Sequence, residues 1–219
     1  MEFYLALQED HEIVFDMIKN TPHSETLHKL AREVYNERIP FNRVSMAWSV
    51  WLMTNASFTG SPHGSWRWCN GVSGSDVGKV LGKKRNQMSE ALYNRIKFAQ
   101  ISCKDAIKVI ESRDRDNTFF YLDPPYPGAN QKHYRGYTMK DLIVLLDLLE
   151  TIKGKFILSN YWSQTLKMYI ARNNWHTVSI KGHVIINQIH RESTVKSKVE
   201  WLIMNFTPPV NLKQYTIEL

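Results

Sequence analysis

The stretch Phe119-Phe120-Tyr121-Leu122-Asp123-Pro124-Pro125-Tyr126 decides how the second half of the chain folds. Residues 118–122 are bulky, apolar and β-favouring, so they predict a strand that is buried on both faces of a sheet. Proline has no N–H to donate to a neighbouring strand, so the two prolines end it. They also hold the backbone of Asp123 and Pro124 extended, with the carbonyls directed into the crevice where open α/β sheets bind ligands.

Length and composition indicate a globular protein with a substantial core. The 219 residues, 43% of them hydrophobic, suffice for one α/β domain with an appended lobe. No apolar run approaches the roughly 18 residues that span a bilayer, and the first residues do not form a secretory signal, so we expect a cytoplasmic protein without a membrane partner. Cys69 and Cys103 are far apart and have no ligand-spaced neighbours, which favours two reduced thiols over a disulfide or a metal site.

The charge of the chain favours a polyanionic partner. The formal net charge is +7 and the pI is about 9.3. Positive excess attracts phosphate polymers through the release of counterions, so nucleic acid becomes a favoured partner, although many basic proteins bind none.

The order of predicted elements indicates a helical lobe followed by an α/β core. Apolar spacing predicts helices over residues 3–20, 24–39, 41–54 and 88–93. A strand is expected over residues 96–103, and then a helix that Ser102 or Asp105 caps. After the central strand we expect helices over 139–152 and 164–171 and strands over 155–159, 175–180 and 199–206. This alternation is typical of a doubly wound sheet, with the lobe at residues 1–95 and the core at 96–219.

Two segments of the lobe have side chains suited to nucleic acid. Residues 55–71 form a glycine- and proline-rich loop or hairpin whose aromatic and basic side chains suit stacking on bases and contact with phosphate. Alternatively, Trp66 and Trp68 fold back as a small core beneath the loop. The basic cluster Lys83, Lys84 and Arg85 either contacts phosphates or is the solvated start of a helix. In the core, residues 128–138 are a candidate lid.

These motifs together resemble the DNA adenine-N6 methyltransferases, and their Dam-like branch in particular, over nearly the whole chain. The segment Phe120-Tyr-Leu-Asp-Pro-Pro-Tyr126 resembles the catalytic motif of that branch. Asn55-Ala-Ser-Phe-Thr-Gly60 is similar to the loop that begins its target-recognition region. Ile157-Leu-Ser-Asn-Tyr161 and Glu200-Trp-Leu-Ile-Met-Asn205 resemble its later strands.

The resemblance implies a partial Rossmann-like methyltransferase sheet with an inserted target-recognition lobe. It also implies transfer of a methyl group from S-adenosylmethionine to the N6 amine of a flipped adenine in double-stranded DNA, without a metal, in a bacterial or phage-encoded system. The implied catalytic residues are Asp123, Pro124, Pro125 and Tyr126, and the implied cofactor residues are Asp123, Ser102, Cys103 and Asp105. The expected DNA-contacting residues are Asn55, Phe58, His63, Trp66, Arg67, Lys83, Lys84, Arg85, Tyr134 and Arg135.

The residue types of the catalytic motif suit this chemistry. The lone pair of an exocyclic adenine amine is delocalised into the ring, which makes the amine a poor nucleophile. Two acceptors for its hydrogens, the Asp123 carboxylate and the Pro124 carbonyl, would direct the lone pair at the methyl donor. Tyr126 could hold the flipped base by stacking. The alternative is a motif that merely ends a strand.

The chain departs from the Dam-like pattern in one respect. It has neither an Ala-x-Gly-Gly-Lys-like segment nor a Phe-x-Gly-x-Gly turn, the glycines of which let the backbone approach the cofactor. The remaining strands would leave an open edge and an uncovered apolar face. We therefore expect a second polypeptide to supply the glycine-rich half. The alternatives are a catalytically silent DNA-binding or regulatory protein and, less favoured, methylation of RNA or protein.

Overall fold

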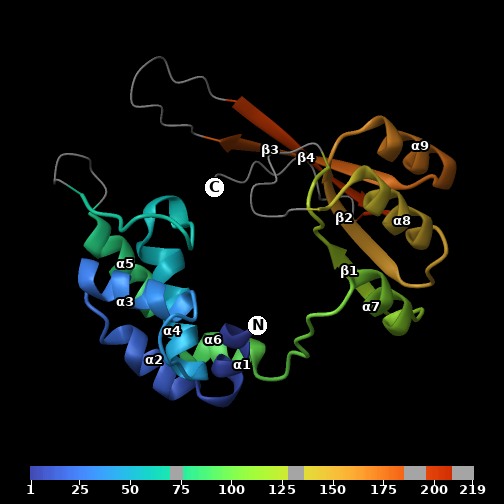
Figure 1. Cartoon of the computed structure of the whole chain (residues 1–219). Helices are drawn as coiled ribbons and strands as arrows, with labels where there is room; N and C mark the ends of the chain where they lie inside the picture. Colours follow the sequence, from blue (N-terminus) through green and yellow to red (C-terminus); the bar gives the residue numbers. More distant parts are fainter. Residues whose placement is uncertain (70–75, 128–135, 185–195, 209–219) are drawn as a thin grey trace. The chain divides into compact units, whose positions relative to one another are not determined.

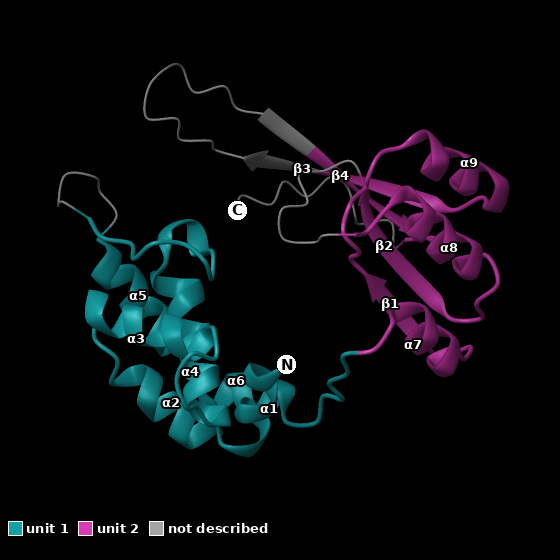
Figure 2. Cartoon of the chain, viewed as in Figure 1, with its two compact units in different colours: residues 1–103 teal, residues 104–219 magenta. Residues whose placement is uncertain are grey.

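The computed structural model describes residues 1–69, 76–127, 136–184 and 196–208 (Figure 1). The chain divides into two compact units, residues 1–103 and 104–219 (Figure 2). The division therefore falls a few residues after the boundary at 95 that the sequence suggests. It follows an irregular segment that continues from the last helix of the first unit.

The first unit is a helical bundle around one central helix. Its described helices are α1 (Glu2–Glu9), α2 (His11–Lys19), α3 (Glu25–Tyr35), α4 (Arg43–Ala56), α5 (Val77–Asn86) and α6 (Glu90–Ile96), with a 3-10 turn at Phe58–Gly60. The helix expected over residues 3–20 is two helices, because the chain breaks at Asp10. α4 contacts α1, α2, α3 and α5. Its Trp48, Trp51, Leu52 and Met53 are buried, which explains an apolar pattern that extends nearly all round this helix.

Helix ends in this unit follow the capping residues of the sequence. Ser24 caps α3, with its Oγ accepting from the backbone N–H of Leu27 at 3.3 Å. Asn42 and Ser45 form a reciprocal capping box at the start of α4. Such caps satisfy N–H groups that have no partner within the helix, so they fix where each helix begins.

The strand expected over residues 96–103 is wrong. Ile96 is the last residue of α6, and residues 97–103 form no strand. Leu92, Tyr93 and Ile96 share one helix face that packs against the core of the first unit. Phe98 has no such partner and is 86% exposed. The apolar run thus belongs to the end of a helix and not to the sheet.

The second unit is a mixed sheet with helices between its strands. Its described elements are α7 (Ala106–Arg113), β1 (Phe119–Leu122), α8 (Met139–Leu149), β2 (Lys155–Tyr161), α9 (Gln164–Asn173), β3 (His176–Val184) and β4 (Lys196–Met204). The strand order is β1-β2-β4-β3. β1 and β2 are parallel, whereas β4 lies antiparallel between β2 and β3. The expected strand–helix–strand alternation is confirmed for the three strands that run in one direction, and β4 makes the sheet mixed.

One face of this sheet carries the core of the unit. Phe156 and Leu158 of β2 and Ile203 of β4 are fully buried in one cluster with side chains of α7, α8 and α9. Phe120 and Leu122 of β1 pack against the same cluster. Successive strand residues point to opposite faces, so Phe119 and Tyr121 point away from it.

β1 is therefore not buried on both faces, contrary to the sequence prediction. Phe119 is 54% exposed and Tyr121 is 62% exposed. Within the described residues β1 pairs only with β2, so its other edge has no neighbouring strand. The apolar side chains that predicted a strand buried on both faces are present, but the face with Phe119 and Tyr121 is exposed among the described residues.

Hydrogen bonds from Asp114 and Asn205 hold the turn that leads into β2. The Asp114 carboxylate accepts from the backbone N–H groups of Lys153 and Gly154, at 2.9 to 3.0 Å. These N–H donors lower the pKa of Asp114. Asn205 accepts from Phe156 N–H at 3.0 Å and donates to the Gly154 carbonyl at 2.9 Å. A Cβ on Gly154 would lie 2.8 Å from the Thr118 carbonyl oxygen, so this close approach requires glycine.

Candidate active site and DNA-contacting residues

The turn that follows β1 (residues 123–127, here called the catalytic turn after the role expected from the sequence) is held by a pair of hydroxyl contacts. The Tyr126 hydroxyl donates to Oδ1 of Asp123 at 3.0 Å and lies 2.7 Å from the Ser159 hydroxyl. Ser159 is on β2, and Leu122 pairs with Leu158 in the parallel register. The carboxyl ends of the two strands therefore lie side by side and bring the three side chains together.

The Tyr126 phenol is neutral and serves as a donor. Burial raises its pKa strongly, the neighbouring Asp123 raises it further, and the hydrogen bond with Ser159 opposes this. Asp123 itself is exposed. Among the described residues, only Tyr126 forms a hydrogen bond or ion pair with its carboxylate. Among the described residues the site thus presents a carboxylate that Tyr126 orients through one oxygen, while no hydrogen bond or ion pair holds the other.

Aromatic side chains surround the carboxyl end of β2. The rings of Tyr126 and Tyr161 pack edge to face, with centroids 4.5 Å apart. The ring of the next residue, Trp162, is partly exposed, and its centroid lies 4.6 Å from that of the Trp201 ring on β4. The Tyr161 ring limits the position of Tyr126 in the catalytic turn and offers flat apolar surface beside it.

The structure brings together part of the predicted catalytic set and adds one residue. Asp123 and Tyr126 are in contact, with Pro124 and Pro125 between them and partly buried. Sequence reasoning missed Ser159. The sequence signal that could have found it is the polar pair Ser159-Asn160, which ends an apolar strand. One helix separates this strand from the catalytic motif, and parallel strands joined by one helix are often neighbours in the sheet.

The predicted cofactor residues other than Asp123 take no part in this contact. Ser102 and Cys103 are exposed at the end of the first unit. Asp105 caps α7, with Oδ1 accepting from Lys108 N–H at 3.2 Å. In the described part of the chain no hydrogen bond or ion pair joins these residues to Asp123, so their role stays a prediction.

The loop at residues 57–67, here called the recognition loop after the role expected from the sequence, is held by side chains of α3 and the segment before it. His28 Nε2 lies 2.8 Å from Ser57 Oγ, and both residues are buried. His23 Nε2 lies 2.9 Å from the carbonyl of Arg67, and Arg32 donates to the carbonyl of Gly64. The backbone of the loop is therefore fixed while its outer side chains remain available.

The outer side chains of the recognition loop divide into two groups. Phe58 and His63 are exposed, and Trp68, just beyond the loop, is 65% exposed. Trp66 is half-buried, with its ring 5.0 Å from that of His23. The alternative of a small core beneath the loop therefore holds for Trp66, whereas it is wrong for Trp68.

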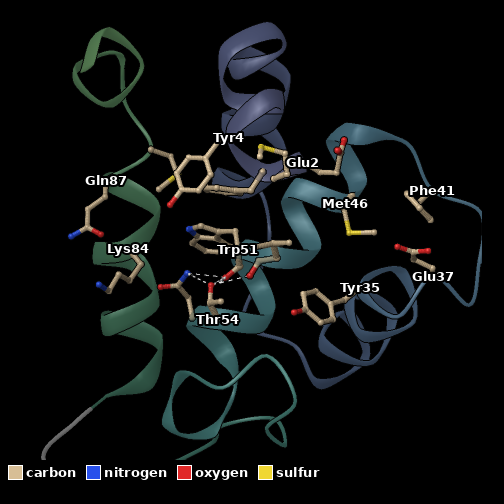
Figure 3. Close-up of a pocket in the computed structure, with 15 residues that line it drawn as sticks. Glu2, Tyr4, Tyr35, Glu37, Phe41, Met46, Trp51, Thr54, Lys84 and Gln87 are labelled. Carbon is tan, nitrogen blue, oxygen red and sulfur yellow. Dashed lines mark hydrogen bonds between the residues drawn. The ribbon is translucent and has the colours of Figure 1, made fainter. Parts of the chain in front are cut away.

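A cavity in the first unit brings together two residues expected to contact DNA. Asn55 of α4 and Lys84 of α5 both line a cavity of about 600 Å³. Figure 3 shows Lys84 and Gln87 on one side of this cavity and Tyr35 and Glu37 on another. The amide nitrogen of Asn55 donates to the Trp51 carbonyl at 2.8 Å, which leaves its oxygen as an acceptor.

The basic cluster lies at the end of a helix and not at its start. Lys83, Lys84 and Arg85 occupy the last turn of α5, where positive charge is favourable to the helix dipole. Lys83 and Lys84 are exposed. Tyr134 and Arg135, and with them most of the candidate lid, lie outside the described residues.

Neither a metal site nor a membrane span is found among the residues that the structure describes. No group of three or more His, Cys, Asp and Glu side chains there could hold a metal ion. No helix in the described ranges is long and apolar enough to cross a membrane. Cys69 and Cys103 are free thiols, and both are exposed.

Comparison with known proteins gives one family for this site. The sequence model of the D12 class N6 adenine-specific DNA methyltransferases matches residues 74–184, just over half of the 219 residues. The matched range contains the catalytic turn and both strands that form the site. A search among curated proteins gave no match. Because the family model covers the site and half of the chain, the protein belongs to the D12 class of N6 adenine-specific DNA methyltransferases.

Proposed function

We propose that this chain is the catalytic subunit of a site-specific adenine methyltransferase that uses S-adenosylmethionine and acts on a flipped adenine in double-stranded DNA. The observation that carries the proposal is the Asp123 carboxylate, which Tyr126 orients at the carboxyl end of β1. This edge of an α/β sheet is where ligands bind. The family match supports the adenine N6 amine as the group that is methylated.

Asp123 contributes by orienting the amine. Its free oxygen accepts one N–H of the adenine amine, and the Pro124 carbonyl accepts the other. Both contacts favour a tetrahedral nitrogen, which localises the lone pair and directs it toward the methyl donor. The gain is one of orientation and electrostatics, and no covalent enzyme intermediate is needed.

S-adenosylmethionine, when bound, would supply an electrophilic methyl group and leave as S-adenosylhomocysteine, while the methylated amine gives up one proton. An exposed carboxylate with an open oxygen also suits the ammonium of its methionine part, so Asp123 fits a place at that end of the cofactor. Ser102, Cys103 and Asp105 remain our candidates for the adenosine end. The cap that Asp105 provides to α7 would have to be compatible with this role.

Base flipping is needed because the amine of a paired adenine lies inside the duplex. We assign Tyr126 and the aromatic side chains near it to hold the flipped base. In the first unit, the recognition loop and the basic end of α5 would contact DNA through the exposed side chains of Phe58, His63, Lys83 and Lys84.

A second polypeptide with a Phe-x-Gly-x-Gly turn would complete the sheet. Among the described residues one edge of β1 is unpaired, and this edge and the exposed rings of Phe119 and Tyr121 support the proposal, since an unpaired edge with apolar side chains is a template for another strand. Covering these rings would remove about 25 cal/mol of unfavourable free energy per Å² of apolar surface.

The test is a methylation assay on duplex DNA with radiolabelled S-adenosylmethionine, performed with the chain alone and with proteins that co-purify with it. We expect N6-methyladenine to form and Asp123→Ala to lower the rate at least about a hundredfold, the effect of losing one oriented polar group from an active site. Asp116→Ala is the matched control, because Asp116 is an exposed carboxylate in the same unit.

Three outcomes would contradict parts of the proposal. Equal activity of Asp123→Ala and the unaltered chain would remove Asp123 from the chemistry. Full activity of the chain as a monomer would remove the need for a second polypeptide. A chain that binds DNA but neither binds S-adenosylmethionine nor methylates DNA with any co-purifying protein would instead be a catalytically silent DNA-binding member of the family.

A further inference from the structure

Ser159 is a buried polar residue that lies outside the catalytic motif but contacts it. Its side chain is on β2 and only 4% of the residue is exposed. Its Oγ lies 2.7 Å from the Tyr126 hydroxyl, which in turn lies 3.0 Å from Oδ1 of Asp123. Buried hydroxyls are nearly always hydrogen-bonded, so the contact with Tyr126 satisfies Ser159 and joins it to the site.

The chemistry of the three groups fixes the direction of the hydrogen bonds. An ionised carboxylate only accepts, and a phenol has one proton to donate. The Tyr126 proton therefore goes to Asp123, and the Ser159 hydroxyl donates to the oxygen of Tyr126. Ser159 thus helps to commit the single proton of Tyr126 to the carboxylate.

The fold makes Ser159 the rigid end of this arrangement. Leu158, directly before it, is fully buried in the core of the sheet. Leu122, directly before Asp123, pairs with Leu158 in the parallel register. Ser159 and Asp123 are therefore equivalent positions on neighbouring strands, one on the buried strand and the other at the start of the exposed turn.

We propose that Ser159 is a positioning residue for methyl transfer, which acts through Tyr126 to hold the Asp123 carboxylate in one orientation. Oδ1 is then occupied, and Oδ2, which no described residue contacts through a hydrogen bond or ion pair, faces the incoming amine. The role in methyl transfer rests on the proposed function. The coupling of Ser159 to Asp123 is a property of the chain alone.

The coupling is tested by NMR on the full chain with carbon-13 in the Asp carboxyl groups and fluorine-19 in the Tyr rings. Asp123→Asn and Tyr126→Phe assign the two signals. We expect Ser159→Ala to shift both, although Ser159 forms no direct hydrogen bond with Asp123, and Ser159→Thr to restore them. Ser163→Ala is the matched control: it removes the serine that caps α9, at 3.2 Å from Leu166 N–H, and should shift neither.

The role is tested by steady-state kinetics in whichever preparation methylates DNA. We expect Ser159→Ala to lower kcat about two- to tenfold, the effect of one neutral hydrogen bond, with KM unchanged. Ser163→Ala should lower thermal stability without changing kcat, because removal of a helix cap costs about 1 kcal/mol and does not reach the turn.

Specific results would overturn the inference. If Ser159→Ala shifts the Tyr126 signal but not the Asp123 signal, Ser159 is not coupled to Asp123. If both signals shift but kcat does not change, Ser159 is structural only. If no preparation methylates DNA and the coupling is nevertheless observed, the proposed function fails while the three-residue coupling stands.

Discussion

The catalytic turn and the recognition loop are both short segments at the surface, but they are fixed in opposite ways. The catalytic turn is held through its own side chains, because Tyr126 contacts Asp123 and Ser159. The recognition loop is held mainly through its backbone, because His23 and Arg32 contact the carbonyls of Arg67 and Gly64.

This difference indicates which positions can vary without loss of structure. Replacing a side chain of the catalytic turn changes the support of the site and its chemistry together. Replacing an outer side chain of the recognition loop leaves the backbone contacts in place, so base contacts can change while the loop keeps its conformation. Such a division suits an enzyme with one reaction and a selectable DNA site.

After Asp123→Ala, the largest effect on the catalytic turn is expected for Tyr126→Phe. It removes the hydroxyl that contacts both Asp123 and Ser159. A hydrogen bond to a charged group contributes about 1.5–3 kcal/mol, so kcat should fall about ten- to a hundredfold. Tyr169→Phe is the matched control, because Tyr169 also donates to an aspartate, Asp147, within the same unit.

Tyr169→Phe should lower the unfolding free energy of the second unit and leave kcat unchanged. DNA affinity, measured by fluorescence anisotropy, should be similar for both variants. Loss of kcat in both variants would show that turnover follows the stability of the unit and not the orientation of Asp123.

The next effect concerns the backbone of the recognition loop. A Cβ on Gly64 would lie 2.7 Å from the carbonyl oxygen of Phe58, so Gly64→Ala should displace the loop and lower stability by about 1–3 kcal/mol. Gly82→Ala is the control: nothing lies within 4 Å of the added atom, and the position is inside α5. Alanine should stabilise that helix by about 0.5–1 kcal/mol.

Chemical denaturation and DNA binding measure both variants. We expect weaker DNA binding only for Gly64→Ala. If its affinity and specificity equal those of the unaltered chain, the conformation of the loop does not determine DNA recognition.

A third prediction concerns pH and the buried contact of His28 with Ser57. Burial, reinforced by the positive charge of Arg32, lowers the pKa of His28. The unfolded chain therefore binds the proton more readily than the folded one. The stabilisation that neutral His28 gives is fully present above its pKa in the unfolded chain, about 6.5. As the pH falls below this value, the free energy of unfolding declines by at most about 1.4 kcal/mol per pH unit, until the pH passes the pKa of His28 in the folded chain.

Urea unfolding of the first unit between pH 7.5 and 5 measures this loss. His28→Gln should abolish this loss of stability at low pH. His63→Gln, at an exposed position of the loop, should leave the loss unchanged. The second unit should show no matching change from Tyr126, because its raised pKa keeps the phenol protonated throughout this range.

Sequence reasoning located the turn that ends β1 because the motif is local. Proline chemistry and the apolar run fix the end of β1 without reference to the rest of the chain. The Ser159 contact could not be obtained in the same way, since it depends on the register between β1 and β2. The exposed face of β1 was missed because an apolar run has the same composition whether one side or both sides are covered.

The strand expected over residues 96–103 failed for a similar reason. Ile96 and Phe98 are compatible with a strand by composition, but tertiary packing placed Ile96 on the face of α6 that meets the first core. Phe58, His63, Trp66 and Arg67 could be assigned to a loop from sequence, whereas Asn55 lies in α4 and the basic cluster lies at an unexpected helix end. Burial could not be assigned in this way, which is why Trp66 and Trp68 differ despite being two positions apart.

The smallest predicted effect tests whether the basic end of α5 contacts phosphate. Lys84 is exposed and has no ion pair among the described residues, so Lys84→Ala should weaken binding to all DNA sequences alike. Removing one phosphate contact should reduce the slope of log K against log salt by about 0.9. Lys29→Ala is the control, because Lys29 is paired with Glu25 at 2.9 Å and should leave the slope unchanged. A slope unchanged in Lys84→Ala would assign the cluster to the helix dipole, and sequence-dependent weakening would instead indicate contact with a base.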